Sequence, residues 1–464
     1  MGSRSPPFRL LARCVAVAGV VVLTACGHDD GGQPGGPVRP GLWARTYGGA
    51  SADVASSVQP TADGGYIVVG YTSSFGAGGM DAWVLKLDSE GNVVWQKTYG
   101  GPGDDPANSV QRSADGGYVV AGRTSASLGV PGSGDAWVMK LNGNGDVIWQ
   151  KTFGSPGPDE ARSVEPTADG GYVVAGTWNY DAWVLKLDAT GNVLWQRTYG
   201  GSGGDNALAA QPTSDGGYIV VGDTSSYEGT QAGGAPWVLK LDNYGNVVWQ
   251  KYYAVGVPSN GARSVRQTTD GGYIVAGYTN AWRMLGNFSQ GDVWLLKLDA
   301  AGNVEWQRKY GLNAREEAYS LQLTADGGYV VAGFTEISEY PALYRRALLL
   351  KLDTAGSVVW TKTFGGDNGG DEARFVQVTA DGSYIVAGLT GAFRAEDAWV
   401  LKLDANGAIN GCAIAAGEGA VGADTIATTV SSTVNAVDTN TVPTSGKFNP
   451  TDSTGMVLEQ CRYE

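Results

Sequence analysis

One unit repeated seven times is the feature that most constrains what this chain can fold into. Each copy carries Asp-Gly-Gly-Tyr, with Ser for the second Gly in the last copy, followed by a segment ending in Lys-Leu and then, in most copies, Gly-Asn-Val-x-Trp. A period of 46 to 56 residues is typical of propellers, solenoids and other repeat arrays. The tyrosines that mark the copies are Tyr66, Tyr118, Tyr172, Tyr218, Tyr273, Tyr329 and Tyr384.

Within one unit, the sequence predicts four short antiparallel strands. The segment 55–61 and the segment 66–70 flank a Gly-rich turn, which indicates a β-hairpin. The segment 81–87 and the segment 93–99 follow, separated by a tight turn that contains Gly91 and Asn92. Two of these segments are almost continuously apolar, so both faces of each sheet should be covered by neighbours.

The two ends of the repeat region indicate a closed ring. The seventh copy ends after residue 404 without its Trp-x-Lys-Thr-Tyr strand, and residues 43–47 at the start supply a matching segment. We therefore predict that residues 42–404 form an all-β, seven-bladed propeller of four-stranded blades, closed by the N-terminal strand. Thirteen of the fifteen tryptophans recur on the third and fourth strands and are expected to pack between blades. Trp178 and Trp282 fall outside this pattern.

The N-terminus has the layout of a secretory leader. Arg4, Arg9 and Arg13 precede an apolar run over residues 15–23, which is typical of a signal peptide. The following Leu-Thr-Ala-Cys tetrapeptide resembles the lipobox of bacterial lipoproteins, and the resemblance implies cleavage after residue 25 and a lipid on Cys26. Gly27, rather than Asp, favours the outer membrane by the same resemblance. The alternative is an ordinary signal peptide with an incidental cysteine. Residues 26–41 are expected to be a flexible tether.

Charge and cysteines limit the partners and the compartment. The net charge of −14 makes nucleic acid a poor partner. In an oxidising envelope, with Cys14 in the leader and Cys26 acylated, Cys412 and Cys461 are expected to form a disulfide. This disulfide would staple a C-terminal extension, residues 405–464, that is rich in Thr, Ser and Val. Its role does not follow from the sequence.

The segment from Lys86 to Trp95, Lys-Leu-Asp-Ser-Glu-Gly-Asn-Val-Val-Trp, resembles the tryptophan-docking repeat of quinoprotein-type propellers. It departs from that pattern, because Trp95 lies seven residues after Asp88 rather than eight and no Thr precedes Gly91. The family's enzymes also have eight blades, adjacent cysteines and calcium-binding acids in the cofactor site, whereas this chain has seven repeats and no adjacent cysteines. The resemblance therefore implies the fold and no cofactor. A non-enzymatic branch, the propeller lipoproteins of the outer-membrane barrel-assembly machinery, suggests an assembly factor.

Variable loops at one end of the ring are the expected binding surface. We call this end the top; the nearly identical Asp-Gly-Gly hairpins lie at the bottom. Loops that vary on a rigid scaffold usually carry binding residues, and aromatic and Arg side chains can hold a glycan or a protein. Alternatively, these rings only cover the end of the propeller. The candidates are Trp178, Tyr180, Tyr227, Trp282, Arg283, Tyr340, Tyr344, Arg345, Phe393 and Arg394.

Acidic residues recur at the same end. Six of the seven links between blades carry an acid at one equivalent position, where the other has Asn260, and five blades add an Asp before the third strand, at Asp81, Asp135, Asp181, Asp292 and Asp397. Such carboxylates could hold a hard cation such as calcium. They could equally accept backbone N–H bonds that fix the loops, which we favour for a feature present in every blade. The candidates for a metal are Asp53, Asp105, Asp159, Asp205 and Asp371. The third-strand lysines are expected either to snorkel or to pair with bottom-face Asp residues.

Catalysis has little support in the sequence. The single histidine, His28, lies in the tether, so no His-based triad or zinc site can be built in the propeller. A carboxylate pair of the glycosidase type stays open as an alternative. The favoured hypothesis is a non-catalytic, lipid-anchored envelope scaffold that recognises a protein or a glycan. An outer-membrane assembly factor is the first alternative, and a carboxylate-based glycan hydrolase is the second.

Overall fold

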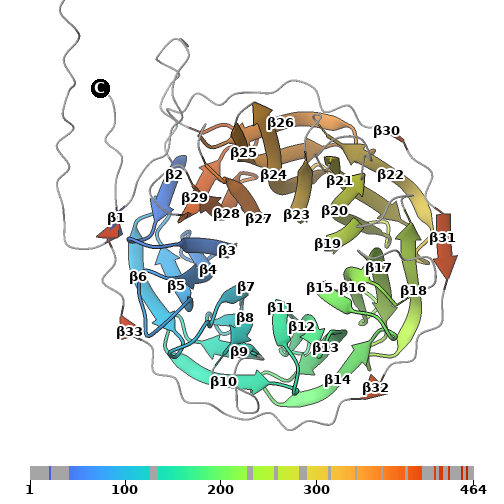
Figure 1. Cartoon of the computed structure of the whole chain (residues 1–464), viewed down its shortest axis with the longest axis horizontal. Coiled ribbons are helices and arrows are strands. Elements are labelled where there is room, and N and C mark those ends of the chain that lie inside the picture. Colours follow the sequence, from blue (N-terminus) through green and yellow to red (C-terminus); the bar gives the residue numbers. More distant parts are fainter. Residues whose placement is uncertain are drawn as a thin grey trace, which may run out of the picture.

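The chain folds into a ring of seven antiparallel sheets, each with four strands from the repeat region (Figure 1). The computed structural model describes residues 41–125, 134–226, 234–254, 260–281, 290–311, 315–339, 342–366, 369–391 and 396–409, together with a few short strands outside these ranges. All elements in this part of the chain are strands. The prediction of an all-β, seven-bladed propeller is therefore confirmed.

Each blade contributes one strand to the inside of the ring and one to the outside (Figure 1). The first, innermost strands are β3 (Asp53–Pro60), β7 (Ala107–Arg112), β11 (Asp159–Pro166), β15 (Asp205–Pro212), β19 (Asn260–Gln267), β23 (Glu316–Leu323) and β27 (Glu372–Val378). The second strands are β4 (Tyr66–Thr72), β8 (Tyr118–Thr124), β12 (Tyr172–Trp178), β16 (Tyr218–Thr224), β20 (Tyr273–Ala281), β24 (Tyr329–Glu339) and β28 (Tyr384–Thr390).

The outer half of each blade follows in the same order. The third strands are β5 (Asp81–Leu87), β9 (Asp135–Leu141), β13 (Asp181–Leu187), β17 (Ala235–Leu241), β21 (Gln290–Leu298), β25 (Ala342–Leu352) and β29 (Asp397–Leu403). The fourth strands are β6 (Val93–Tyr99), β10 (Val147–Phe153), β14 (Val193–Tyr199), β18 (Val247–Ala254), β22 (Val304–Tyr310) and β26 (Val358–Phe364), with β2 (Trp43–Tyr47) serving the seventh blade.

Strand β2 closes the ring as the repeat pattern predicts. It pairs antiparallel with β29, from Trp43 opposite Lys402 to Tyr47 opposite Ala398. The seventh blade is therefore built from both ends of the repeat region, in the order β2-β29-β28-β27. This pairing joins segments that are far apart in sequence, so it forms only when the whole ring assembles.

Several short strands lie outside the repeat region. Strands β30 (Ala423–Asp424), β31 (Thr428–Ser431), β32 (Val437–Asp438) and β33 (Thr451–Asp452) pair with the outer strands β22, β18, β14 and β6, and β1 (Val20–Val21) pairs with β34 (Met456–Val457). Cys26, Cys412 and Cys461 lie outside the described residues. No helix long and apolar enough to cross a membrane occurs in the part of the chain that the structure describes.

The bottom hairpin explains the Asp-Gly-Gly-Tyr signature. Gly64 has a φ of 81°, a left-handed conformation that glycine adopts without strain. The Asp63 carboxylate accepts hydrogen bonds from the Thr61 hydroxyl and, at 3.2 Å, from the Gly65 amide. Tyr66 then begins the second strand. The turn therefore needs these residue types for its own geometry, which accounts for its repetition.

Each outer-strand tryptophan packs against the next blade. Trp43 meets Tyr66 edge-on, with ring centroids 5.9 Å apart, and its Nε1 donates to the Ser89 carbonyl at 3.0 Å. A Cβ added to Gly91 would lie 3.0 Å from the Trp43 ring, so the glycine of the turn makes room for the indole. Five later Trp–Tyr pairs repeat this arrangement. The predicted inter-blade packing of these tryptophans is present.

The third-strand lysines pair with the hairpin acids, as expected. Lys86 is buried, and its Nζ lies 2.8 Å from Asp63 Oδ2 and 3.0 Å from the Leu87 carbonyl. Partial burial raises the pKa of Asp63, but the Lys86 ammonium and the Thr61 and Gly65 donors outweigh it and hold the pKa at about 2. The same ion pair recurs in the other six blades.

A β-bulge near the top of each first strand shapes the inner wall of the ring. In blade one, Ala55 and Ser57 pair with consecutive residues of β4, so Ser56 is the extra residue. Gly70 lies opposite the bulge, and a Cβ there would fall 1.8 Å from the Val54 carbonyl oxygen. Every blade has this bulge between a buried Ala and the next paired residue.

Candidate functional site at the top of the inner wall

Four of the ten predicted ligand-binding residues lie in the described part of the chain. They are Trp178, Tyr180, Tyr344 and Arg345. The structure does not bring the four together, because they come from blades three and six. The other six candidates lie outside the described residues: Tyr227, Trp282, Arg283, Tyr340, Phe393 and Arg394.

Trp178 and Tyr344 are packed rather than displayed. Trp178 is 7% exposed, and its ring centroid lies 5.4 Å from that of Trp183 in the core between blades two and three. Tyr344 is 9% exposed, with the Arg346 guanidinium 5.5 Å from its ring. A buried ring offers a ligand little surface, so these two side chains stabilise the top end of the ring instead.

Tyr180 is the exposed member of the set. Its side chain is 63% exposed at the turn between β12 and β13. Asn179 and Tyr180 have φ angles of 49° and 73°, which fit a two-residue hairpin turn of type I′. The Tyr180 carbonyl accepts a hydrogen bond from the Asp205 amide at 2.7 Å, so the turn is fixed to blade four. This aromatic ring is available to a partner at the top face.

The five metal candidates are buried and accept hydrogen bonds from the links between blades. Each carboxylate accepts a hydrogen bond from a backbone amide of the preceding link. The donors are Gly49 to Asp53 at 2.7 Å, Gly101 to Asp105 at 2.7 Å, Ser155 to Asp159, Gly201 to Asp205 at 3.0 Å and Gly366 to Asp371 at 3.0 Å. Burial raises the pKa of Asp53, Asp159 and Asp371, and these donors oppose the rise. The arrangement supports the loop-fixing alternative. No group of three or more metal-ligating side chains occurs among the described residues.

The bulge residues form a ring that sequence reasoning did not single out. They lie near the top ends of the innermost strands and are partly or fully exposed, whereas the preceding alanines are buried. In blade order they are Ser56, Asn108, Arg162, Leu208, Arg263, Tyr319 and Arg374. Blades five, six and seven thus present Arg, Tyr and Arg side by side. The sequence signal that could have identified these residues is one variable position inside an otherwise repeated strand.

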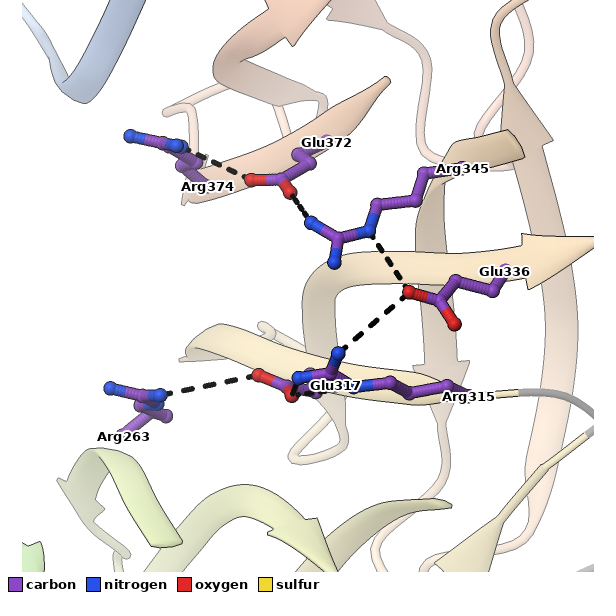
Figure 2. A network of polar contacts seen from close by, with 7 residues as sticks. All are labelled: Arg263, Arg315, Glu317, Glu336, Arg345, Glu372 and Arg374. Carbon is purple, nitrogen blue, oxygen red and sulfur yellow. Dashed lines mark hydrogen bonds and ion pairs between the residues drawn. The ribbon is translucent and has the colours of Figure 1, made fainter. Parts of the chain in front are cut away.

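A chain of ion pairs joins these three blades at this level (Figure 2). We call it the axial network; it comprises Arg263, Arg315, Glu317, Glu336, Arg345, Glu372 and Arg374. Charges alternate along it and an arginine stands at each end. The sequence prediction had included one of these residues, Arg345, because only the fold brings β19, β23, β24, β25 and β27 together.

Arg345 is the centre of the axial network. Its Nε donates to Glu336 at 3.1 Å and its Nη1 donates to Glu372 at 2.5 Å. Burial lowers the pKa of Arg345, but the two carboxylates outweigh it and raise the pKa above its usual value. The guanidinium also lies 4.3 Å from the centroid of the Phe334 ring, a cation–π contact. Its position is therefore fixed by three partners.

The two ends of the axial network are held more loosely. Arg374 Nε donates to Glu372 Oε2 at 3.3 Å, and Arg263 Nη2 lies 4.0 Å from Glu317 Oε2. The Arg263 guanidinium also lies 5.2 Å from the centroid of the Tyr278 ring. Arginine has five N–H donors, and the Arg263 and Arg374 side chains are 32% and 33% exposed, so part of each guanidinium can reach a ligand.

Burial differs by charge within the axial network. The side chains of Glu317, Glu336 and Glu372 are 4%, 12% and 7% exposed. The four arginine side chains are 30% to 35% exposed. The acids therefore anchor the guanidinium groups from behind, and the surface that solvent meets is positively charged. This patch contrasts with the net charge of −14 of the chain.

Aromatic side chains support the same patch. The rings of Tyr319 and Phe334 have centroids 5.7 Å apart. Burial is the main cause that raises the pKa of Tyr319, so its hydroxyl stays protonated and can donate a hydrogen bond. The Arg315 guanidinium, which pairs with Glu317, lies 5.8 Å from the centroid of the Phe334 ring. Arg side chains and the partly exposed Tyr319, backed by the buried Phe334 ring, are suited to hold a carboxylate or a peptide segment.

A second ring of polar residues lies three positions further down the first strands. Its members are Gln59, Gln111, Glu165, Gln211, Arg266, Gln322 and Gln377. Arg266 Nε donates to Gln322 at 3.1 Å, and its Nη1 donates to the Val265 carbonyl at 2.8 Å. Burial raises the pKa of Glu165 and lowers that of Arg266, each against the opposing charge of the other. The amides, Glu165 and Arg266 supply donors and acceptors below the axial network.

Comparison with known protein families identifies the repeat. A family model described as outer membrane protein assembly factor BamB matches residues 80–235 and residues 134–333, which together span more than half of the chain. The chain belongs to this family. This BamB-family propeller has seven blades. The quinoprotein-type enzymes that the repeat resembles have eight, so the resemblance to those enzymes is partial. No protein with a curated function matches the sequence.

Solved structures align with this BamB-family chain only at low similarity. Sqt1 from Chaetomium thermophilum has a TM-score of 0.44 and 15% identity, over 79% of this chain and 85% of Sqt1. Drosophila Semaphorin 1b, extracellular domains 1-2, has a TM-score of 0.38 and 7% identity, over 76% and 88%. Endo-1,5-alpha-L-arabinanase from Thermotoga petrophila RKU-1 has a TM-score of 0.27 and 13% identity, over 77% and 100%. At these scores the alignments carry no argument.

Proposed function

We propose that this chain is a non-catalytic, lipid-anchored protein of the cell envelope that binds a protein partner at the top of its inner wall. The observation that carries the proposal is the axial network, whose acids are buried and whose arginines face solvent. A partner that presents a carboxylate there would meet Arg263, Tyr319 and Arg374 on three consecutive blades.

Residue type supports recognition at this place. Arginine and tyrosine are enriched among the residues that dominate binding energy at interfaces. Guanidinium groups hold carboxylates through paired N–H bonds, which are stronger than neutral hydrogen bonds. The axial network fixes Arg345 and Arg315 in place, so on binding a partner would have to order only the two end residues, Arg263 and Arg374. Tyr180 adds an exposed ring on blade three.

The family favours a protein over a glycan as the partner. Its description, outer membrane protein assembly factor, names work on proteins of the outer membrane. A lipid on Cys26 would place the propeller at a membrane, and the tether of residues 26–41 would let it reach a neighbour. We therefore prefer the assembly-factor form of the envelope scaffold to free surface display or glycan hydrolysis.

The test is affinity capture with the tagged full-length chain, cross-linked in envelopes of cells that produce it. Three versions are compared: the wild type, Arg263→Gln/Arg374→Gln, and the control Arg112→Gln. Arg112 is an exposed arginine at the bottom end of β7, whose Nη1 donates to the Pro60 carbonyl at 3.4 Å. We expect the wild type and the control to capture the same protein and the double variant to lose it at least about tenfold, the loss of roughly one strong contact.

Two outcomes contradict the proposal. If no protein is captured by the wild type, protein recognition fails as the function. If the double variant captures as well as the wild type, the axial network is not the binding site, and Tyr180 would be the next described residue to exchange.

A further inference from the structure

Pairs of acidic side chains meet where one blade joins the next at the top. We call the junction between consecutive blades a seam. At the seam between blades one and two, the Asp105 amide donates to the Met80 carbonyl at 2.5 Å, and Asp81 and Asp105 form a backbone bridge. The start of a third strand is thereby fixed beside the start of the next first strand. Two carboxyl groups that are distant in the repeat become neighbours.

Five of the seven seams have such a pair. Equivalent backbone bonds from the first-strand residue to the preceding blade are present at the seams of Asp53, Asp159 and Asp205. The five pairs, which we call the seam acid pairs, are Asp397 with Asp53, Asp81 with Asp105, Asp135 with Asp159, Asp181 with Asp205, and Asp292 with Glu316.

At the seams of Asp105 and Asp53, the two carboxyl groups lie over a single glycine. A Cβ added to Gly100 would fall 2.1 Å from Asp81 Oδ1 and 2.9 Å from Asp105 Oδ2. At Gly48 the corresponding distances are 2.5 Å to Asp397 Oδ1 and 2.7 Å to Asp53 Oδ2. Both oxygens thus occupy the space of one missing side chain, so they are close to each other.

At the seam of Asp81 and Asp105, one carboxylate oxygen has no donor among the described residues. Asp81 is 1% exposed; its Oδ2 accepts from the Ala77 amide at 2.8 Å, and its Oδ1 has no hydrogen-bond partner in the described chain. Asp105, by contrast, accepts from Gly101, Thr124 and Ser125. A buried carboxylate oxygen that lacks a donor and faces a second carboxylate is costly in its charged form.

The other two seams avoid this cost through different residues. Arg346 takes the place of the third-strand acid at the seam of blades six and seven, and its charge acts on Asp371. Ala235 and Asn260 occupy the two positions at the seam of blades four and five, which leaves it neutral. Wherever the sequence departs from two acids, the seam has either an internal cation or no charge. At the seam of Asp81 and Asp105, no cation acts on Asp81 among the described residues, whereas Lys309 faces Asp292 at the seam of blades five and six.

We propose that each seam acid pair holds one proton between its two carboxyl groups in the folded protein. One side chain is then a carboxylic acid that donates its O–H to the neighbouring carboxylate, which gives Asp81 Oδ1 the partner that it lacks. A metal ion suits the sites less well, because calcium takes six to eight oxygen ligands, and no group of three or more ligating side chains occurs in the described chain.

Charges that face the pairs are few. Burial raises the pKa of Asp81, Asp159 and Asp181. The charge of the partner acid, which is Asp105, Asp135 and Asp205 respectively, also raises it. Lys309 faces Asp292. Close to the pair of Asp397 and Asp53, the charges of Asp53, Arg374, Glu372 and Glu396 all act on the Tyr71 hydroxyl. Burial and the Asp53 charge raise the pKa of Asp397 to about 7. No cation is among the groups that act on Asp81 or Asp181 in the described chain, so the proton fills that role there.

The experiment measures thermal unfolding of the full chain from pH 4 to pH 8. One variant replaces Asp81, Asp135, Asp181, Asp292 and Asp397 by Asn, so every seam acid pair loses one ionisable group but keeps its shape. We expect the wild-type midpoint to fall between pH 5 and pH 8 and the variant's midpoint to stay nearly level. At pH 6 the wild type should release up to about five more protons on unfolding than the variant does.

Two single variants provide a matched control. Asp105→Asn changes a seam acid pair, and Asp371→Asn changes the same position of the repeat at the Arg346 seam. Asp105→Asn should reduce the pH dependence and cost little at pH 8, whereas Asp371→Asn should lower the midpoint at pH 5 and at pH 8 alike. These singles also serve if the fivefold variant does not fold.

Two results would overturn the inference. In the first, the wild type and both types of Asn variant show the same dependence on pH. In the second, calcium added to EDTA-treated protein at pH 8 raises the midpoint of the wild type and leaves that of the Asn variants unchanged, which would assign the missing positive charge to a metal ion.

Discussion

At the scale of single residues, exposure decides which aromatic side chains can bind a partner. Trp178 and Tyr180 are two positions apart in the sequence, yet one is 7% and the other 63% exposed. Strand β12 ends at Trp178, which turns toward the Trp183 ring, and the hairpin then lifts Tyr180 into solvent. The sequence places both at the top end and cannot separate their roles.

Trp178→Ala tests this separation against Tyr180→Asn. The first change leaves a cavity beside Trp183 and should lower the free energy of unfolding by about 3–5 kcal/mol. The second keeps a residue that tolerates a positive φ and should change it by less than about 0.5 kcal/mol. Urea unfolding followed by tryptophan fluorescence measures both. Equal effects of the two changes would refute the assignment of Trp178 to the core.

At the scale of strands, ring closure depends on β2. Without it, β29 would expose an unpaired edge, and the Trp43–Tyr66 contact and the hydrogen bond from the Tyr47 hydroxyl to the Gly91 carbonyl, 2.7 Å, would be lost. Strand β2 is the outer strand of the seventh blade, and its Trp43 packs against Tyr66 of the first blade. Its five residues therefore have more effect on the fold than the length of the strand suggests.

A chain that begins at residue 49 should differ sharply from one that begins at residue 41. We expect the longer chain to unfold cooperatively and the shorter one to lose more than about 4 kcal/mol of stability, since two buried aromatic side chains and a full strand pairing disappear. Circular dichroism with heating, together with size-exclusion chromatography, measures the difference. Matching melting curves would mean that the ring does not need its closing strand.

At the scale of the whole molecule, two sets of acids set the dependence of stability on pH. The seven hairpin acids, of which Asp63 is the first, have pKa values below the usual range because of their lysines and turn donors. Their contribution is present above pH 4 and is lost as pH falls toward 2. Several seam acids, such as Asp81 and Asp397, have raised pKa values, so their contribution is complete below pH 4 and is lost as pH rises toward 7.

The two trends together predict a stability maximum between about pH 4 and pH 5. The hairpin acids are more than half exposed, so each one contributes little and the acid side should be shallow. Melting temperatures measured in steps from pH 2 to pH 8 at constant ionic strength give the curve. A maximum at pH 7 or above would contradict the assignment of raised pKa values to the seams.

The sequence by itself determined the ring, the blade count, the closing strand, the tryptophan docking and the lysine–aspartate pairs. Each of these follows from contacts that recur from repeat to repeat, so the residues that make them appear at the same spacing along the sequence. Only the tertiary structure decided which residues meet once the ring is closed. The axial network joins five strands of three blades, and the seam acid pairs join adjacent blades. Both depend on side chains that differ from copy to copy or lie far apart within one copy, and periodicity carries no information about such distances.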